Sequence, residues 1–150
     1  MPERAEVLAV VQQWVQKAEN DLKTATYTLQ LKEECPTDTV CFHAQQCIEK
    51  YSKAVLVYNG VDFPRTHNLS VLIVLLPQPS CLSLTAEEQE RLTDYATTTR
   101  YPGDYEPIPV GEARQAVRLA RRTRRELRKL LPKEILQKLS RPKTKRGSRV

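Results

Sequence analysis

The densest set of reactive side chains lies in residues 37–68, TDTVCFHAQQCIEKYSKAVLVYNGVDFPRTHN. Lysine, arginine and histidine suit a phosphate, because their N–H groups donate strongly to anionic oxygens, whereas amides and tyrosines suit a base or a sugar. We therefore expect this stretch to bind a phosphate-containing ligand. The side chains that we expect to bind it are His43, Gln46, Lys50, Lys53, Arg65 and His67.

A second polar cluster follows in residues 95–105, YATTTRYPGDY. It supplies groups of the same kinds, and we expect these groups to complete the ligand site. They are Arg100, Tyr101, Asp104 and Tyr105. The identity of the ligand stays open, with ATP or another nucleotide as the cofactor that such groups would suit.

Each of these groups also has a purely structural interpretation. Glu49 and Lys53 are four residues apart and would form a stabilising pair on a helix. His43 stands near a helix start, where a histidine is more often structural than catalytic. His67 would hydrogen-bond a loop carbonyl, and residues 100–102 would form a helix terminus packed on a dimer partner.

The element that must position the first cluster is a long helix over residues 41–58. Its apolar side chains fall in one wide arc at 100° per residue and its polar ones on the other side, so we expect it at the centre of a bundle. Thr37 or Asp38 is expected to cap its start, Gly60 to cap its end, and Pro64 to keep the loop from resuming the helix. The apolar arc holds Cys41, Ala44, Cys47, Ile48, Tyr51, Ala54, Val55 and Tyr58.

The remaining elements also have helical patterns, which predicts an all-α protein, an antiparallel bundle of four to five helices. In the first helix, Lys17, Asp21 and Lys23 lie outside the apolar stripe and are expected to be solvated. Thr85 opens a later helix with a capping box. The expected helices cover residues 6–32, 69–76, 85–100 and 112–131, with a short turn over 134–139.

The stretch FHAQQCIEKYSKAVLVYNGVDFPRTHNL resembles the signature helix and loop of the HEPN domain, a small helical domain linked to nucleotide binding. Residues 95–105 match more weakly, and with the helix around Trp14 the resemblance covers about residues 9–120. It implies a helical bundle that forms a homodimer, with its site near the dimer seam. It also implies a frequent partner, a small nucleotidyltransferase, in toxin–antitoxin-like pairs.

Ribonucleases of the HEPN superfamily carry an arginine, then four to six residues, then a histidine. Arg100 stands at about the right place, but the positions five to seven beyond it are Tyr105, Glu106 and Pro107. We therefore expect no catalytic residue of the usual kind and favour binding over catalysis. A ribonuclease with a non-standard site, built on Arg100 and Tyr105 or on Lys50 and His43, stays open as an alternative.

Positive charge is concentrated at the C-terminal end of the chain. Residues 1–111 hold nine Lys and Arg against fifteen Asp and Glu, a net charge of −6, whereas residues 112–150 hold fifteen against three, a net charge of +12. We expect a bundle over residues 1–131 and a basic, disordered tail over 132–150. The outward cations expected to contact RNA, DNA or an acidic partner are Arg118, Arg121, Arg122, Arg125, Arg128 and Lys129. No aromatic residue follows Tyr105, so phosphate contact without base stacking is the expected mode in this region.

Several other classes of site are excluded. The chain lacks a glycine-rich phosphate loop and an apolar run long enough for a transmembrane helix. Its four cysteines, Cys35, Cys41, Cys47 and Cys81, form no CxxC pair, and we expect buried, reduced thiols and no metal site. We expect a cytoplasmic protein with no membrane contact.

Overall fold

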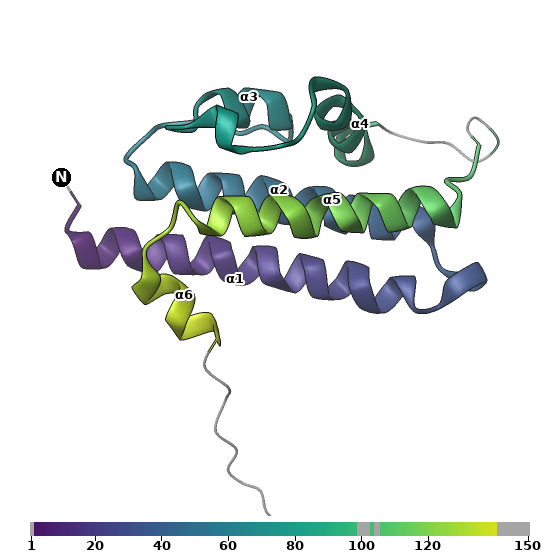
Figure 1. Cartoon of the computed structure of the whole chain (residues 1–150), viewed down its shortest axis with the longest axis horizontal. Helices are drawn as coiled ribbons and strands as arrows, with labels where there is room; N and C mark the ends of the chain where they lie inside the picture. The colour runs from purple at the N-terminus through teal and green to yellow at the C-terminus, as the bar shows by residue number, and fades with distance from the viewer. Residues whose placement is uncertain (1, 99–102, 104–105, 141–150) are drawn as a thin grey trace, which may run out of the picture.

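The structure of the protein is a computed structural model, which describes residues 2–98, 103 and 106–140. Within that part the chain is all-helical, as expected, with four long helices, two short ones and two 3-10 turns (Figure 1). The sixth helix occupies the segment where we expected a short turn. The elements are α1 (Arg4–Leu29), η1 (Lys32–Glu34), α2 (Thr37–Tyr58), α3 (Leu69–Val74), η2 (Pro79–Cys81), α4 (Ala86–Thr97), α5 (Val110–Arg128) and α6 (Lys133–Ser140).

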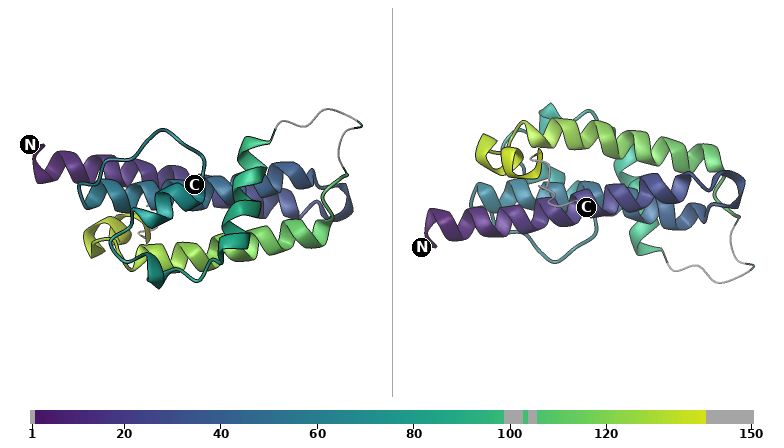
Figure 2. Two further views of the ribbon diagram at one scale, coloured as in Figure 1. Left: turned by 90° about the horizontal axis from the view of Figure 1, so that it is seen from above. Right: turned by 90° about the horizontal axis from the view of Figure 1, so that it is seen from below.

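Three long helices lie side by side and form the body of the bundle. Helix α1 runs antiparallel to α2 and to α5, so α2 and α5 run parallel to each other, and the α3–α4 segment connects them (Figure 1). Helices α3 and α4 cover α2, and α4 lies across α2 and α5 (Figure 2). Helix α6 packs on α1, where Ile135 is buried, so the folded part extends beyond residue 132.

Helix α2 is the centre of the bundle, as its wide apolar arc predicts. Tyr51, Ile48 and Leu56 are among the largest fully buried side chains. The helix ends at Tyr58, with Asn59 as its C-cap. Gly60 follows, as expected, with a positive φ of 68° in the left-handed region, and the N–H of Val61 donates to the carbonyl of Leu56. The expected start is wrong, because Pro36 and not Thr37 or Asp38 is the N-cap.

The short helices begin where side chains satisfy their first N–H groups. Asn68 accepts from the backbone of Ser70 and Val71 and so starts α3, which confirms the expected helix in this segment. Thr85 and Glu88 form the expected capping box at the start of α4. These caps fix where the chain turns over the polar side of α2.

An ion cluster joins the three long helices. Glu19 of α1 accepts a bidentate pair from Arg124 of α5, with N–O distances of 2.5 and 3.1 Å, and a hydrogen bond from Tyr51 of α2. Burial alone would raise the pKa of Glu19, but the bonds from Arg124 and Tyr51 outweigh it and lower this pKa. Arg128 donates to the Tyr51 hydroxyl at 3.0 Å. The cluster therefore serves the packing of the bundle.

The thiols behave as apolar core residues, with one exception. Cys35, Cys41 and Cys47 are buried as expected, and burial raises the pKa of Cys41 to about 12. Cys81 is exposed, so the expectation of burial is wrong there. No metal-binding group of His, Cys, Asp and Glu, and no helix able to span a membrane, occurs within residues 2–98, 103 and 106–140.

Candidate functional site

The first candidate cluster is centred on Asp21, where α1 meets α2. His43 Nδ1 lies 2.7 Å from Asp21 Oδ1, and Lys50 Nζ lies 2.7 Å from Asp21 Oδ2. The carboxylate is buried, whereas the side chains of His43 and Lys50 keep 27% and 22% of their surface exposed. The Asp21 cluster, meaning Asp21, His43 and Lys50, is therefore a charged group that opens to solvent.

A second cluster is centred on Glu49 of α2. Lys53 Nζ lies 2.8 Å from Glu49 Oε2, and His67 Nδ1 lies 2.9 Å from Oε1. The amides of Gln45 and Gln46 each donate to Glu49 Oε1 at 3.1 Å. Lys53 also lies over the rings of Trp14 and Phe63, and its side chain is only 10% exposed.

The structure thus divides the predicted ligand residues of the first cluster into two groups. Asp21 brings His43 and Lys50 together, and Glu49 brings Gln46, Lys53 and His67 together. Most of the polar side of α2 is not exposed, because neighbouring helices and the loop after α2 cover it. Gln45, Gln46, Glu49 and Lys53 are buried.

The other predicted ligand residues are less constrained. Arg65 is exposed on the loop between Phe63 and His67, and no hydrogen bond or ion pair of its side chain occurs within the described part of the chain. Arg100, Tyr101, Asp104 and Tyr105 lie outside the described residues.

Sequence reasoning missed Asp21, which we expected to be solvated. It is 7% exposed and holds the Asp21 cluster together. A signal was present, because Asp21 stands three residues after Ala18 and seven after Trp14, at helical spacing from two residues of the apolar stripe. A carboxylate at such a position faces the neighbouring helix and needs a partner there.

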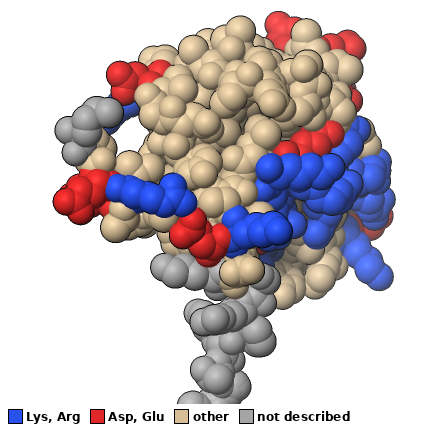
Figure 3. Space-filling view, turned by 60° about the vertical axis from the view of Figure 1, so that its left-hand side comes forward, with Lys and Arg blue, Asp and Glu red and all other residues tan. Residues whose placement is uncertain are grey.

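Helix α5 carries the basic surface. Figure 3 shows Lys and Arg side chains gathered in one area on this side of the molecule. Arg118, Arg121, Arg125 and Lys129 are exposed or partly exposed, as expected. The expectation is wrong for Arg128, which contacts Tyr51, and Arg122 is half-buried, 3.4 Å from Glu88.

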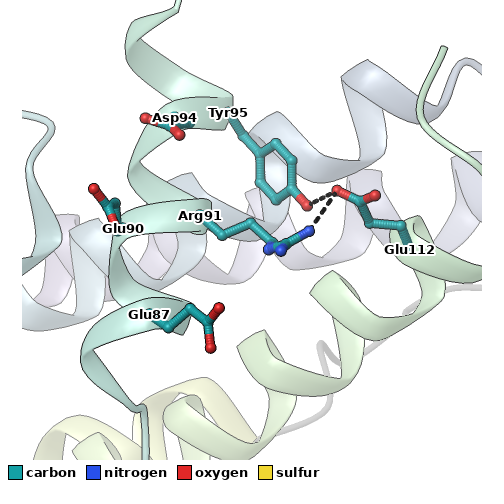
Figure 4. Close-up of a pocket in the computed structure, with 6 residues that line it drawn as sticks. All are labelled: Glu87, Glu90, Arg91, Asp94, Tyr95 and Glu112. Atoms are coloured by element: carbon teal, nitrogen blue, oxygen red, sulfur yellow. Dashed lines mark hydrogen bonds and ion pairs between the residues drawn. The ribbon is translucent and has the colours of Figure 1, made fainter. Parts of the chain in front are cut away.

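A hollow of about 300 Å³ lies between α4 and α5. Tyr95 donates to Glu112 at 2.5 Å, Arg91 lies 3.7 Å from the same oxygen, and Figure 4 shows Glu87, Glu90 and Asp94 nearby. Burial and the bond to Glu112 raise the pKa of Tyr95, so its hydroxyl remains a donor. An excess of carboxylates repels phosphate, and we do not place the ligand here.

Comparison with known proteins agrees with this fold. The family model described as the HEPN domain matches residues 11–131. An archaeal HEPN homologue, ST0689, and the protein TT1696 from Thermus thermophilus each superpose with a TM-score of 0.63 at 24% identity, covering 81% of this chain and 98% of theirs. At that identity the two structures show the fold alone.

One curated relative is similar over a shorter stretch. It is the protein of Methanocaldococcus jannaschii named "Putative toxin MJ1304", which is 44% identical over 52 residues. The match covers 35% of this chain and spans only 32% of the relative's length. Because the family match covers most of the chain and the helical bundle agrees with it, this protein belongs to the HEPN domain family.

Proposed function

We propose that this HEPN-domain protein binds a phosphate-containing ligand, a nucleotide, at the Asp21 cluster. The observation that carries the proposal is the pair of partly exposed cationic or donor groups, His43 and Lys50, fixed on one buried carboxylate. A lysine ammonium has three N–H donors, and Asp21 takes one of those on Lys50. The remaining donors of Lys50 are suited to the oxygens of a phosphate, and Nε2 of His43 joins them when the imidazole is protonated.

Further groups extend this site. Arg65 is exposed, and its planar guanidinium can donate two parallel hydrogen bonds to a phosphate. Of the other predicted ligands, Arg100, Tyr101, Asp104 and Tyr105 remain candidates for the same site. Gln46 and Lys53 would act indirectly, because their polar groups are bound to Glu49 and support the helix that carries Lys50.

We propose further that the protein is one member of a toxin–antitoxin-like pair and that its partner is a small nucleotidyltransferase. The name of the Methanocaldococcus relative supports the toxin context. The resemblance to HEPN proteins supports the partner, which would bring a nucleotide-derived group to the exposed donors of the Asp21 cluster. Co-purification of this protein with the product of a neighbouring nucleotidyltransferase gene tests the pairing.

Calorimetry with ATP, GTP and their diphosphates tests the ligand. Loss of one charged partner of a bound phosphate costs about 1.5–3 kcal/mol, so Lys50→Ala should weaken binding about tenfold or more. Lys17→Ala is the matched control, because it removes an exposed lysine of α1 outside the cluster. The helical circular dichroism signal should be unchanged in both variants. Absence of heat with any nucleotide at millimolar concentration would remove the proposal.

Homodimer formation is a separate expectation of the same proposal. HEPN relatives commonly dimerise with their sites near the seam, and a partly exposed Asp21 cluster on two adjacent helices suits such an arrangement. Light scattering at tens of micromolar protein should give twice the mass of the chain or a higher even multiple. A monomer alone at that concentration contradicts the expectation.

A second candidate function is RNA cleavage at His43, and the contact between His43 and Asp21 favours it. A carboxylate that accepts from Nδ1 orients the imidazole and leaves Nε2 to move a proton to or from a ribose 2′-hydroxyl. Lys50 would stabilise charge on the phosphate. Cleavage of a generic RNA that His43→Gln abolishes and Lys17→Ala retains would favour this function over simple binding.

A further inference from the structure

We propose that the groove between α1 and α5 binds single-stranded nucleic acid, with the phosphates on the cations of α5 and a base stacked on Tyr27. This inference goes beyond nucleotide binding at the Asp21 cluster and uses different residues. The groove has a volume of about 420 Å³. It is lined by Glu19, Leu22, Lys23, Thr26, Tyr27, Gln30, Arg121 and Arg124.

The phosphate-binding part is a stripe of cations on α5 and its C-terminal cap. The stripe is Arg114, Arg118, Arg121, Arg125 and Lys129, spaced by four, three, four and four residues, which keeps all five on one helix face. At 1.5 Å per residue they span roughly 22 Å, enough for several successive phosphates. Their density exceeds what solvation of a helix face requires.

Negative charge inside the groove is already neutralised. Glu19 is the one acidic side chain among the described residues that line it, and Arg124 binds both of its oxygens. Arg128 lies 3.9 Å from the same carboxylate. Lys23 of α1 and Arg121 of α5 then leave the groove with a positive charge. A chain of phosphates therefore meets little repulsion there.

The aromatic ring on which a base would stack belongs to α1. The sequence alone did not indicate that α1 lies beside α5. Tyr27 lines the same groove as Arg121 and is 64% exposed. Arg121 Nη2 donates to Thr26 at 2.7 Å, so the neighbouring residue of α1 is in direct contact with the basic stripe. An exposed aromatic ring beside cations is the arrangement on which unpaired bases stack. We expected no base stacking near the basic helix, and Tyr27 supplies the missing ring.

These features favour a single strand over the alternatives. Bases in a duplex are already stacked on their neighbours and cannot reach Tyr27, whereas an acidic protein would use the cations but gain nothing specific from the aromatic face. The amide of Gln30 adds a polar group at the end of the groove that suits a base edge or a sugar.

The test is fluorescence anisotropy with labelled single strands of about 12 nucleotides and an RNA duplex of matched length, using the full chain. Oligouridylate and oligothymidylate form the two single-strand arms and distinguish RNA from DNA. Tyr27→Ala should weaken single-strand binding on the order of tenfold. Tyr27→Phe, which keeps the ring, should bind like the unaltered protein.

The cationic stripe is tested by the salt dependence of binding. The double variant Arg121→Gln/Arg125→Gln should make the negative slope of log affinity against log salt shallower by about 1.4, since each phosphate contact on a single strand contributes about −0.7. Lys23→Gln should also make the slope shallower. Lys17→Gln is its control, because it removes the same charge from α1 at a position roughly 120° away from Lys23 around the helix axis.

Two kinds of result would overturn the proposal. The first is single-strand binding that Tyr27→Ala leaves unchanged, or duplex binding as tight as single-strand binding, because either shows that no base stacks in the groove. The second is equal competition by polyglutamate of matched charge, which would assign the surface to an acidic protein partner.

Discussion

Two carboxylate clusters lie on the polar side of α2, one centred on Asp21 of α1 and one on Glu49 of α2. Each pairs its carboxylate with a lysine and a histidine, and they differ in how many donors are already used. Glu49 accepts from Lys53, His67 and two glutamine amides. The side chains of Glu49 and Lys53 are only 3% and 10% exposed, so this ion pair is closed, whereas the side chain of His67 is 55% exposed at the edge of the cluster. Asp21 accepts from His43 and Lys50, whose side chains are about one quarter exposed.

The difference shows why residue type and spacing alone do not identify a ligand site. In the Glu49 cluster the covering loop brings His67 and the ring of Phe63, so the ammonium of Lys53 is satisfied inside the protein. In the Asp21 cluster the side chains of both His43 and Lys50 still reach solvent, and donors are left over. A closed cluster contributes to stability, and an open one is suited to binding.

The largest effect is expected from removing the centre of the closed cluster. Glu49→Ala leaves the buried ammonium of Lys53 without a carboxylate, and breaking such a pair costs about 3–5 kcal/mol. Urea or guanidinium unfolding measures this loss. The double variant Glu49→Leu/Lys53→Met should recover more than half of it, because both charges are then absent. A loss below about 1 kcal/mol for the single variant would show that the cluster is not closed.

A smaller loss of stability is expected at the open cluster. Asp21→Ala removes the acceptor of His43 and Lys50, but both side chains reach solvent, and water replaces the lost partner. We expect a cost of about 1–2 kcal/mol in the free energy of unfolding, measured in the same denaturant series. A cost equal to that of Glu49→Ala would contradict the proposed division of roles.

The fold could be predicted from the sequence because its signals are local and repeated. The apolar arc of α2, Gly60 after it and the capping box at Thr85 each indicate an element without knowledge of its neighbours. The N-cap of α2 was missed because the side chains of Thr37 and Asp38 are of the types that usually cap a helix. Pro36 caps it without any side-chain hydrogen bond, so its residue type gave no sign of this role.

The sites were predicted in part, because they depend on which helices meet. His43 and Lys50 could be selected by residue type, but their shared partner Asp21 is 22 and 29 residues away, on another helix. The covering of Lys53 by Phe63, the contact of Arg128 with Tyr51, and the position of Tyr27 beside Arg121 are likewise consequences of packing. Periodicity in one segment contains no information on these contacts.

The smallest expected effect is the contribution of Glu49 to the pH dependence of the free energy of unfolding. Burial raises the pKa of this carboxyl group, but the bonds from Lys53, His67 and Gln45 outweigh it, so the pKa in the folded state lies below its ordinary value of 4.5. The stabilisation is therefore complete above pH 4.5 and is lost as the pH falls through the folded-state pKa, because the unfolded chain then binds more protons. Each unit of lowering contributes about 1.4 kcal/mol.

Glu49→Gln separates this contribution from that of Glu19, whose pKa is also lowered. Gln keeps the shape of the side chain and cannot titrate, so the free energy of unfolding of the variant should fall less steeply than that of the unaltered protein between about pH 5 and pH 3. Denaturant titrations at several pH values give both curves, and their difference belongs to Glu49 alone because Glu19 is present in each protein. Parallel curves would mean that Glu49 has the same pKa in the folded and unfolded states, which contradicts the prediction.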